Sequence, residues 1–429
     1  MLADDSADYP RNFSLVFQLN ERLDEERLRA AIEAATQRHP LLRAVVETKG
    51  DRPQQWIACP NPSYELMWSD EPRDAAEPLR PFDLRHEPGV RFHVRRQSDG
   101  DALHVEVHHA TTDGVGAIQF IGDLLTLYQG AAPAPLDPAR LASRDKFGLT
   151  GWRRPIRWLY AAFGWLGAIE FLIHHPAPLG DAAGSVESRL SAFASYAFSQ
   201  DDTAALIQTA KSKNATLNDL LMRDLFLTLQ SFVECYWPER KHSHQRIMVP
   251  TNLRSADDGE LPAANVVAMV NIERRTHRWT DCDRMLHVLH RELAAVKRFK
   301  LGVVFVQILS VLQLLFGSLR RFLPRDRCQA TCVASNLGLV LPQIAADSVR
   351  AVEFYPPIRP LTAAAFGIAT HAGQMTISLH FDASTMTVEQ GQELLERFVA
   401  QLQETGGCVR CAASGRWYSP ATVVRSADS

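Results

Sequence analysis

The chain has 429 residues, more than the ~250 to 300 at which a single hydrophobic core stops growing, so two lobes are expected. Its 46% hydrophobic and 22% charged residues predict a globular protein, and a formal net charge of -3 excludes the basic footprint of a nucleic-acid-binding protein. Seven cysteines fit a reducing compartment better than a disulfide scaffold, and the acidic start of the chain shows no secretory signal. We therefore expect a cytoplasmic protein.

The first hundred residues predict strands and one helix in alternation. Apolar residues alternate with polar ones from Phe13 to Leu19, which indicates a strand with one buried face. Asp24 is the expected N-cap of a helix that ends before Pro40, and residues 44–47 begin a second strand. A third alternating run, at 103–107, precedes the most informative stretch of the chain.

That stretch is His108-His109-Ala110-Thr111-Thr112-Asp113-Gly114. Strand side chains alternate between faces, so His109 shares the apolar face of the preceding strand and points inward. Gly114 marks a turn, and apolar residues then recur at helical spacing from Ile118 to Tyr128. A histidine pair beside an aspartate also suggests a metal, but adjacent strand residues face opposite ways, so we expect no metal here.

The composition changes between about 131 and 188. Ala-Pro repeats at 131–138 indicate a linker, and the segment 152–179 combines arginines with aromatic and aliphatic residues. This segment is either a helix crossing between two lobes or a helix at a membrane interface, because Trp and Tyr prefer the headgroup level.

The second half begins with another helix and strand pattern. Thr216 starts a capping box, and a strand pattern at 246–250 runs into Thr251-Asn252-Leu253-Arg254. Asn265 precedes a further strand pattern at 266–272, and Thr280 is the expected N-cap of the next helix.

Residues 301–319 contain no charge and have basic flanks. As a helix they would reach only about 28 Å, barely the thickness of a bilayer core, and Gln307, Ser310 and Gln313 lie within them. A helix on the membrane surface, drawn to anionic lipid, or packed on the crossing segment is favoured over a transmembrane span.

The last hundred residues carry a strand with Ala334-Ser335-Asn336-Leu337-Gly338, a strand at 374–381 and a helix capped by Thr387. Four cysteines, Cys328, Cys332, Cys408 and Cys411, would make a zinc site if the two pairs met, but ordinary thiols are the default. The histidines His174 and His175 have no partner that identifies a site.

Five motifs in this order resemble the HHxxxDG superfamily, which includes nonribosomal-peptide condensation domains, acyl-CoA-dependent acyltransferases, alcohol acetyltransferases and wax ester synthases. The motifs are Arg38-His39-Pro40-Leu41-Leu42-Arg43, Pro81-Phe82-Asp83-Leu84, the segment His108 to Gly114, Thr251 to Arg254 with Asn265, and Ser335-Asn336-Leu337-Gly338. The resemblance extends from about Phe13 to Leu402. The chain lacks the "DFGWG" element of plant members, which argues against that branch.

The resemblance implies an α/β fold of two lobes, like that of chloramphenicol acetyltransferase, with a mixed sheet and helices in each lobe and a channel between them. We expect an N-terminal lobe at 1–150, an apolar crossover at 151–188 and a C-terminal lobe at 189–429.

It also implies an acyltransferase that moves an acyl group from a thioester, acyl-CoA first, to a hydroxyl of a hydrophobic acceptor, as in lipid metabolism. His109 would be the general base, without a covalent intermediate or a cofactor. His108, Asp113, Gly114 and Arg254 would shape the site, with Asp113 paired to Arg254, and Ser335 and Asn336 are candidates to bind the oxyanion or acceptor.

Three alternatives stay open. In the first, the donor is a thioester on an acyl carrier protein, although the chain has no room for a carrier domain. In the second, the acceptor is an amine. The third is a member of the fold that only binds lipid or a partner protein. Peripheral membrane contact through 152–179 and 301–319 is a further expectation.

Overall fold

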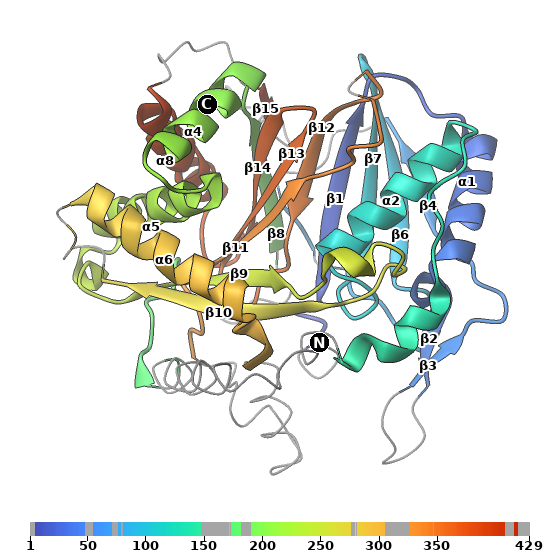
Figure 1. The fold of residues 1–429 in the computed structure, drawn as a ribbon, viewed down its shortest axis with the longest axis horizontal. Coiled ribbons are helices and arrows are strands. Elements are labelled where there is room, and N and C mark those ends of the chain that lie inside the picture. The colour runs from blue at the N-terminus through green and yellow to red at the C-terminus, as the bar shows by residue number, and fades with distance from the viewer. Residues whose placement is uncertain are drawn as a thin grey trace, which may run out of the picture.

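The computed structural model describes residues 5–47, 55–70, 76–78, 80–146, 171, 173–181, 190–275, 279, 281–304, 327–345, 347–407 and 416–418. These residues form two lobes that lie side by side, each a β-sheet with helices against one face (Figure 1). Both sheets contain parallel and antiparallel pairs. The predicted two-lobed α/β fold with a mixed sheet in each lobe is confirmed.

The N-terminal lobe is built on a five-stranded sheet. Its strands are β1 (Asn12–Leu19), β4 (Leu66–Ser69), β6 (Val90–Gln97), β7 (Gly100–His108) and β12 (Val349–Tyr355), in the order β12-β1-β7-β6-β4. Helices α1 (Glu25–Arg38) and α2 (Gly114–Tyr128) cover one face, where apolar side chains of strands and helices form one core. A separate hairpin pairs β2 (Ala44–Glu47) with β3 (Gln55–Ala58).

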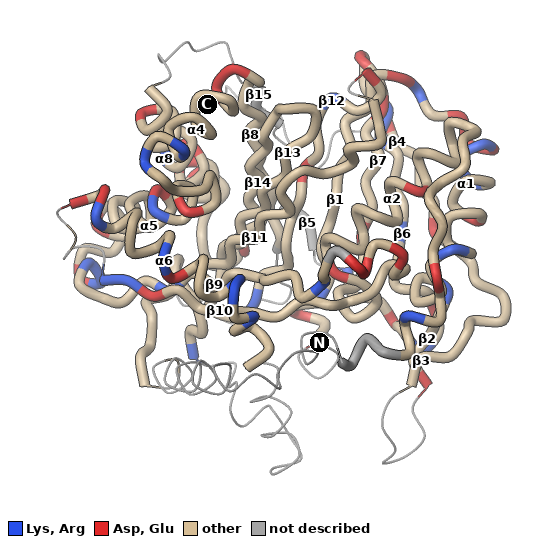
Figure 2. Tube along the Cα trace, viewed as in Figure 1, with Lys and Arg blue, Asp and Glu red and all other residues tan. Residues whose placement is uncertain are grey.

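The C-terminal lobe is built on an eight-stranded sheet, in which seven strands follow the order β10-β9-β11-β13-β14-β8-β15 and the eighth, β5, pairs with β8. The strands are β5 (Ala76–Pro78), β8 (Leu190–Ala197), β9 (Gln245–Asn252), β10 (Val267–Arg274), β11 (Cys332–Leu339), β13 (Ala364–His371), β14 (Gln374–Asp382) and β15 (Arg416–Tyr418). The helices are α4 (Gln200–Ser212), α5 (Leu217–Tyr236), α6 (Cys282–Phe299) and α8 (Val388–Gly406). These helices and the strands of the sheet together bury the largest hydrophobic core of the described residues. The inner strands of this sheet carry no charged residue over most of their length (Figure 2).

Two strands cross between the lobes. β12 comes from the C-terminal half of the chain but pairs with β1 along Ser14↔Tyr355 to Leu19↔Val349. β5 comes from the N-terminal half but pairs with β8. At the junction of the two sheets, a Cβ on Gly367 would lie 1.8 Å from the carbonyl oxygen of Phe354, so β13 and β12 approach each other closely only because residue 367 is glycine.

Polar caps begin the helices close to where the sequence predicts. The Asp24 side chain accepts from Arg27 N, and Thr216 and Thr387 both form capping boxes. The predicted start of α6 at Thr280 is one residue early. Asp281 is the N-cap, because its carboxylate accepts from the backbone N–H groups of residues 283 and 284.

The two segments expected to contact a membrane, 152–179 and 301–319, lie mostly outside the described residues. Across the residues that are described, no helix combines the length and the apolar character needed to cross a bilayer.

The cysteine pairs do not converge into a zinc site within the described residues. Cys408 and Cys411 lie outside them. The Cys328 thiol donates to two carbonyl oxygens, and burial raises its pKa to about 12. Burial also raises the pKa of Cys332. Zinc binds thiolates, so this environment opposes metal binding at Cys328 and Cys332.

Candidate active site between the two lobes

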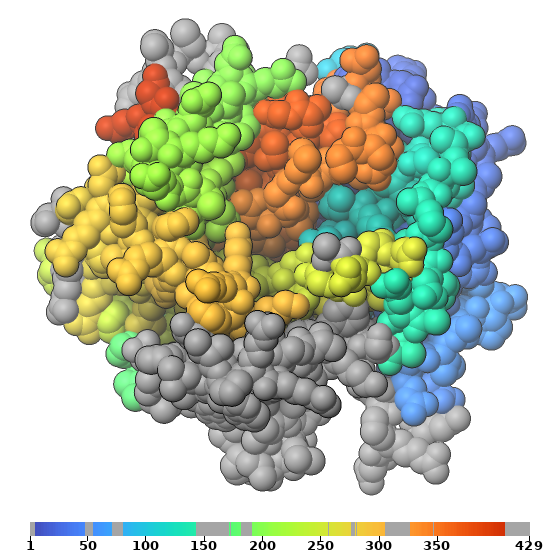
Figure 3. Space-filling view, in the orientation of Figure 1, coloured from blue at the N-terminus to red at the C-terminus, as the bar shows by residue number. Residues whose placement is uncertain are grey.

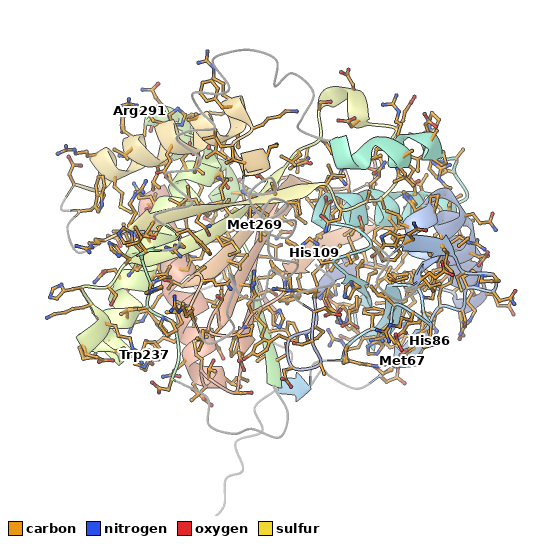
Figure 4. The ribbon with its side chains drawn as sticks, turned by 90° about the horizontal axis from the view of Figure 1, so that it is seen from below. Met67, His86, His109, Trp237, Met269 and Arg291 are labelled. Atoms are coloured by element: carbon orange, nitrogen blue, oxygen red, sulfur yellow. The ribbon has the colours of Figure 1, made fainter. Side chains whose placement is uncertain are left out.

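The face seen in Figure 3 is hollowed between helices α4 and α5 on one side and α2 on the other, with strands of the C-terminal sheet behind. His109 lies between the lobes, near the middle of the molecule (Figure 4). It directly follows β7, and its backbone N–H donates to Arg11 O at 2.7 Å, which continues the pairing of β7 with β1. Its ring packs edge-on against Phe13, at 5.3 Å between ring centres, and stays partly accessible.

The hydrogen bonds around His109 decide which ring nitrogen can act as a base. Nδ1 faces Asn265, whose Nδ2 lies 3.3 Å away. The carbonyl oxygen of His109 accepts from Asn265 Nδ2 at 2.6 Å. Nδ1 is therefore engaged by Asn265, and Nε2 is the ring nitrogen for which no hydrogen-bond partner is found among the described residues.

Burial lowers the pKa of His109 from its ordinary value to about 4. The bond to its own carbonyl and the charge of Asp113 raise this pKa, while the charges of Arg11 and His108 lower it. The ring is therefore neutral at pH 7. Within the described part of the chain, no carboxylate, serine or cysteine side chain hydrogen-bonds to His109, so the arrangement suits a general base rather than the activation of an enzyme nucleophile.

Asp113 turns away from His109 and organises the turn that follows it. Its Oδ1 caps α2 by accepting from Gly116 N at 2.9 Å. Its Oδ2 accepts from Val266 N at 2.7 Å and from Arg254 Nη1 at 2.8 Å. Both charged side chains are nearly buried, 4% exposed for Asp113 and 9% for Arg254. This is the pairing that the motif comparison predicted.

The loop Leu261–Val266 of the C-terminal lobe is the piece that joins the lobes at His109. Besides the bonds from Asn265 and to Asp113, its Ala264 O accepts from Arg254 Nη2 at 2.7 Å. Its Ala263 N donates to His39 Nδ1 at 2.9 Å, which leaves the proton on His39 Nε2 facing Asp123. His39, on the N-terminal lobe, is fully buried.

His108 points to the opposite side of the chain from His109. Its Nδ1 accepts from Ala110 N at 3.1 Å, and its Nε2 lies 3.2 Å from Asp5 Oδ2. Burial raises the pKa of Asp5, but the bonds from His108 and from Arg11 N outweigh it and lower the pKa. The Asp5 carboxylate is therefore ionised and holds His108, which fixes the turn beside His109.

Gly114 lets the C-terminal lobe approach the turn. A Cβ on this residue would lie 2.7 Å from Leu337 Cδ2 and 3.3 Å from Phe354 Cζ. Leu337 belongs to the Ser335-Asn336-Leu337-Gly338 element at the end of β11. The structure therefore brings this element next to the HHxxxDG turn.

The two candidate oxyanion residues of that element differ in direction. Cys332 and Ala334 pack into the core of the C-terminal lobe, so alternation along β11 turns Ser335 to the opposite side of the strand. Asn336 turns the other way: its Nδ2 donates to Asn218 at the start of α5, and its Oδ1 accepts from Gly338 N. No hydrogen bond joins either residue to His109 in the described part of the chain.

Three residues of the site were not predicted as site residues. His39 and Asn265 lie within motifs that the sequence shows, RHPLLR and the segment after Arg254, but both bonds join positions more than 150 residues apart. Asp5 lies outside every motif.

Residues 2–138 match the family model described as "Condensation domain". An uncharacterized protein of Mycobacterium tuberculosis is 24% identical over 94% of this chain and 96% of its own length. Surfactin synthase subunit 1 of Bacillus subtilis is 30% identical over 31% of this chain, which is 4% of that subunit.

Solved structures show the same fold over most of the chain. The first condensation domain of the CDA synthetase matches with a TM-score of 0.68 and 14% identity, covering 94% of this chain and 92% of that one. The family match in the first third and this fold match agree with the geometry of the HHxxxDG turn. Residues 2–138 thus match the condensation-domain family, and the fold is the two-lobed, chloramphenicol-acetyltransferase-like fold of the solved condensation domains.

Proposed function

We propose that this protein transfers an acyl group from a thioester, with acyl-CoA as the donor, to the hydroxyl group of a hydrophobic acceptor. The observation that carries the proposal is His109: a neutral, partly accessible imidazole between the lobes, whose Nδ1 is engaged and whose Nε2 has no partner among the described residues, held by contacts from both lobes. Such a base, without a nucleophilic side chain beside it, favours direct transfer without a covalent enzyme intermediate.

In this reaction, His109 Nε2 takes the proton of the acceptor hydroxyl as its oxygen attacks the thioester carbonyl carbon. The tetrahedral intermediate collapses by breaking the C–S bond, and the departing thiolate takes the proton back from the imidazolium. The products are an ester, a free thiol and neutral His109. A thiolate leaves readily because thiol pKa values lie near ~8.5, and no cofactor is needed because the thioester already activates the acyl group.

The negative oxygen of the intermediate needs hydrogen-bond donors. Ser335 is our candidate because its position on β11 faces away from the C-terminal core, and Leu337 two residues later lies beside the turn at Gly114. Asn336 is a weaker candidate because its amide is engaged with Asn218 and Gly338.

Four residues would shape the site rather than react. Asp113 and Arg254 hold the turn against the loop Leu261–Val266, and His108 holds its other side through Asp5. Gly114 would allow the backbone to pass beside Leu337. Losing any of them should change the position of His109 rather than its chemistry.

A second candidate function is condensation, in which the donor is a thioester on a carrier protein and the acceptor an amine or a hydroxyl. The match of residues 2–138 to the condensation-domain family favours it. The same base and the same oxyanion donors would serve both reactions, so the substrates distinguish them. A role in lipid or partner binding alone is less favoured, because His108, His109, Asp113, Gly114 and Arg254 are all present and connected.

The test is thiol release from acyl-CoAs of increasing chain length, with and without pooled alcohols or amines. We expect acceptor-dependent release that falls at least ~100-fold in His109→Ala, the scale of a lost general base. His86→Ala is the matched control, because His86 is an exposed histidine of the same lobe (Figure 4). If folded protein consumes carrier-bound thioesters and no CoA thioester, the condensation reaction replaces our proposal; if His109→Ala keeps full activity, both fail.

A further inference from the structure

A second cluster of chemically active side chains lies at the edge of the C-terminal sheet. His174 comes from the segment that precedes β8, His244 from the residue before β9, and Glu273 from the edge strand β10. One ligand atom from each can be chosen so that all lie within 4.8 Å of one another, and all three residues are partly exposed. Within the described residues, this is the group whose donors could surround one metal ion.

The distances in the cluster suit a small cation. His174 Nδ1 lies 2.6 Å from Glu273 Oε1, and His244 Nδ1 lies 3.6 Å from the same oxygen. Zinc binds His nitrogen and carboxylate oxygen at ~2.0 to 2.2 Å in a tetrahedron, which separates its ligands by roughly 3.4 Å. The two measured separations lie on either side of that value. The two imidazole rings stack at 30° to each other, so one ring has to turn for both nitrogens to face one ion.

A buried arginine, Arg246, holds two of the three candidate metal ligands, Glu273 and His174, in place by hydrogen bonds. Arg246 donates to Glu273 Oε2 through Nε at 2.9 Å and Nη2 at 2.7 Å, and Nη2 also donates to His174 O at 3.0 Å. Its side chain is 1% exposed. Because Arg246 binds Oε2, the other carboxylate oxygen stays turned toward the histidines. Such outer contacts orient the ligands of metal sites.

A second arginine opposes the ion. Arg275 Nε lies 2.5 Å from His244 Nε2, so Nε2 accepts this bond and the proton of the neutral ring is on Nδ1. For Nδ1 to bind a metal, this proton has to move to Nε2, and Arg275 has to turn away. Arg275 is partly exposed and can do so. Its charge also repels a cation, so it should weaken binding.

We propose that His174, His244 and Glu273 bind one divalent transition-metal ion of the zinc class, with water in the fourth position. The ion connects residue His174, which precedes β8 in the chain, to Glu273 on the edge strand β10. This site lies far along the chain from the HHxxxDG turn. A metal ion that binds only the folded chain stabilises it, because the unfolded chain has no preformed site. The site is separate from the acyl-transfer proposal and does not depend on it.

The experiment is titration of the metal-free full chain with Co²⁺ and Zn²⁺, followed by absorption and thermal unfolding. We expect one Co²⁺ per chain with d–d bands of a nitrogen and oxygen site, no thiolate charge-transfer band, and a rise in unfolding temperature. Absence of the thiolate band separates this site from binding by exposed cysteines such as Cys235.

Matched variants locate the ion. His174→Ala and His244→Ala should each lower the affinity at least tenfold, whereas His290→Ala should leave it unchanged, because His290 lies on α6 and pairs with Asp219 of α5. Arg275→Ala should raise the affinity, an effect that loss of a merely structural contact would not produce. The proposal is overturned if folded wild-type protein binds no Co²⁺, if the thiolate band appears, or if His174→Ala and His244→Ala bind as wild type does.

Discussion

His109 gains its reactive form through burial rather than through a carboxylate partner. The nearest charged group of the motif, Asp113, is engaged with Arg254 and Val266 N and contributes only its distant charge. Its Nδ1 and its carbonyl oxygen are both contacted by the Asn265 amide. The site therefore keeps a neutral base without placing a negative charge where the oxyanion has to form, which would oppose that charge.

The depressed pKa of His109 predicts the acid limit of activity. A group whose pKa is about 4 in the folded protein is unprotonated at every pH well above 4. We expect kcat/KM to stay level down to about pH 5 and to fall as the pH drops through about 4, instead of near the ordinary ~6.5. A pH profile of kcat/KM, with unfolding monitored at each pH, measures this limit. An acid limb near 6.5 in folded protein would show that the ring is solvated in the free enzyme.

Sequence alone was informative about which residues form the site and less so about their directions. The HHxxxDG spacing and the motif ending at Arg254 led to the ion pair between Asp113 and Arg254. The same motifs contain His39 and Asn265, but whether a polar residue bonds across the lobes depends on how the two sheets approach, which no local pattern encodes. Asn336 shows the limit clearly, because a neighbour in α5 takes its amide.

At the scale of elements, the loop 261–266 of the C-terminal lobe connects that lobe to three elements of the N-terminal lobe. It is bonded to the end of β7 through His109, to the cap of α2 through Asp113 and to the end of α1 through His39. Three N-terminal elements thus fix one C-terminal loop. The position of His109 relative to the C-terminal lobe depends on these contacts.

Removing His39 tests this connection. In His39→Ala, Ala263 N–H is left buried without its acceptor, which costs about 1–3 kcal/mol of the free energy of unfolding. We also expect kcat to fall, because the adjacent Asn265 loses its fixed position. Urea unfolding and steady-state kinetics measure the two effects. His86→Ala, an exposed histidine, should change neither, and a destabilised His39→Ala with wild-type kcat would contradict a positioning role for the loop.

The nearly buried ion pair predicts a large asymmetry between single and double variants. Arg254→Ala leaves the Asp113 carboxylate without its charged partner, and we expect about 3–5 kcal/mol of lost stability. Asp113→Asn with Arg254→Ala should lose less than the sum of the two single changes, because no unpaired charge remains. Urea unfolding of the four proteins gives the coupling. Additive losses would show that the pair is solvated despite its burial.

Element boundaries were predicted well wherever a side chain caps or stops the helix. Asp24, Thr216 and Thr387 start their helices as predicted, whereas the start of α6 was placed one residue early because Thr280 and Asp281 are both good caps. Local chemistry cannot choose between adjacent capping residues. The tertiary contacts of the helix make that choice.

At the scale of the whole molecule, the crossing of β12 and β5 makes each lobe depend on the other. The pairing of β12 with β1 joins residues more than 300 positions apart. Periodicity in the sequence predicts that a strand exists but not which strand it pairs with. The sequence therefore led to two lobes divided along the chain at 1–150 and 189–429, whereas the two sheets exchange strands.

This exchange predicts how the N-terminal part behaves alone. A fragment of residues 1–150 lacks β12, whose Val349, Val352 and Phe354 are almost fully buried in the N-terminal core. Burying three such side chains is worth roughly 1.5–3 kcal/mol each, a large share of the ~5–15 kcal/mol that stabilises a domain. The fragment also exposes the edge of β1, which is prone to aggregate. We therefore expect no cooperative unfolding transition from it.

An extended fragment separates this cause from simple truncation. Residues 348–356, attached to residue 150 through a flexible Gly/Ser linker, supply β12 to the same sheet and should restore a cooperative transition in urea. A second version with Val352→Asp and Phe354→Asp keeps the length but cannot bury the strand, and it should behave as the bare fragment does. If residues 1–150 unfold cooperatively without β12, the N-terminal lobe is independent of the exchange. If neither extended version does, the N-terminal lobe also requires contacts such as the bond of His39 to Ala263.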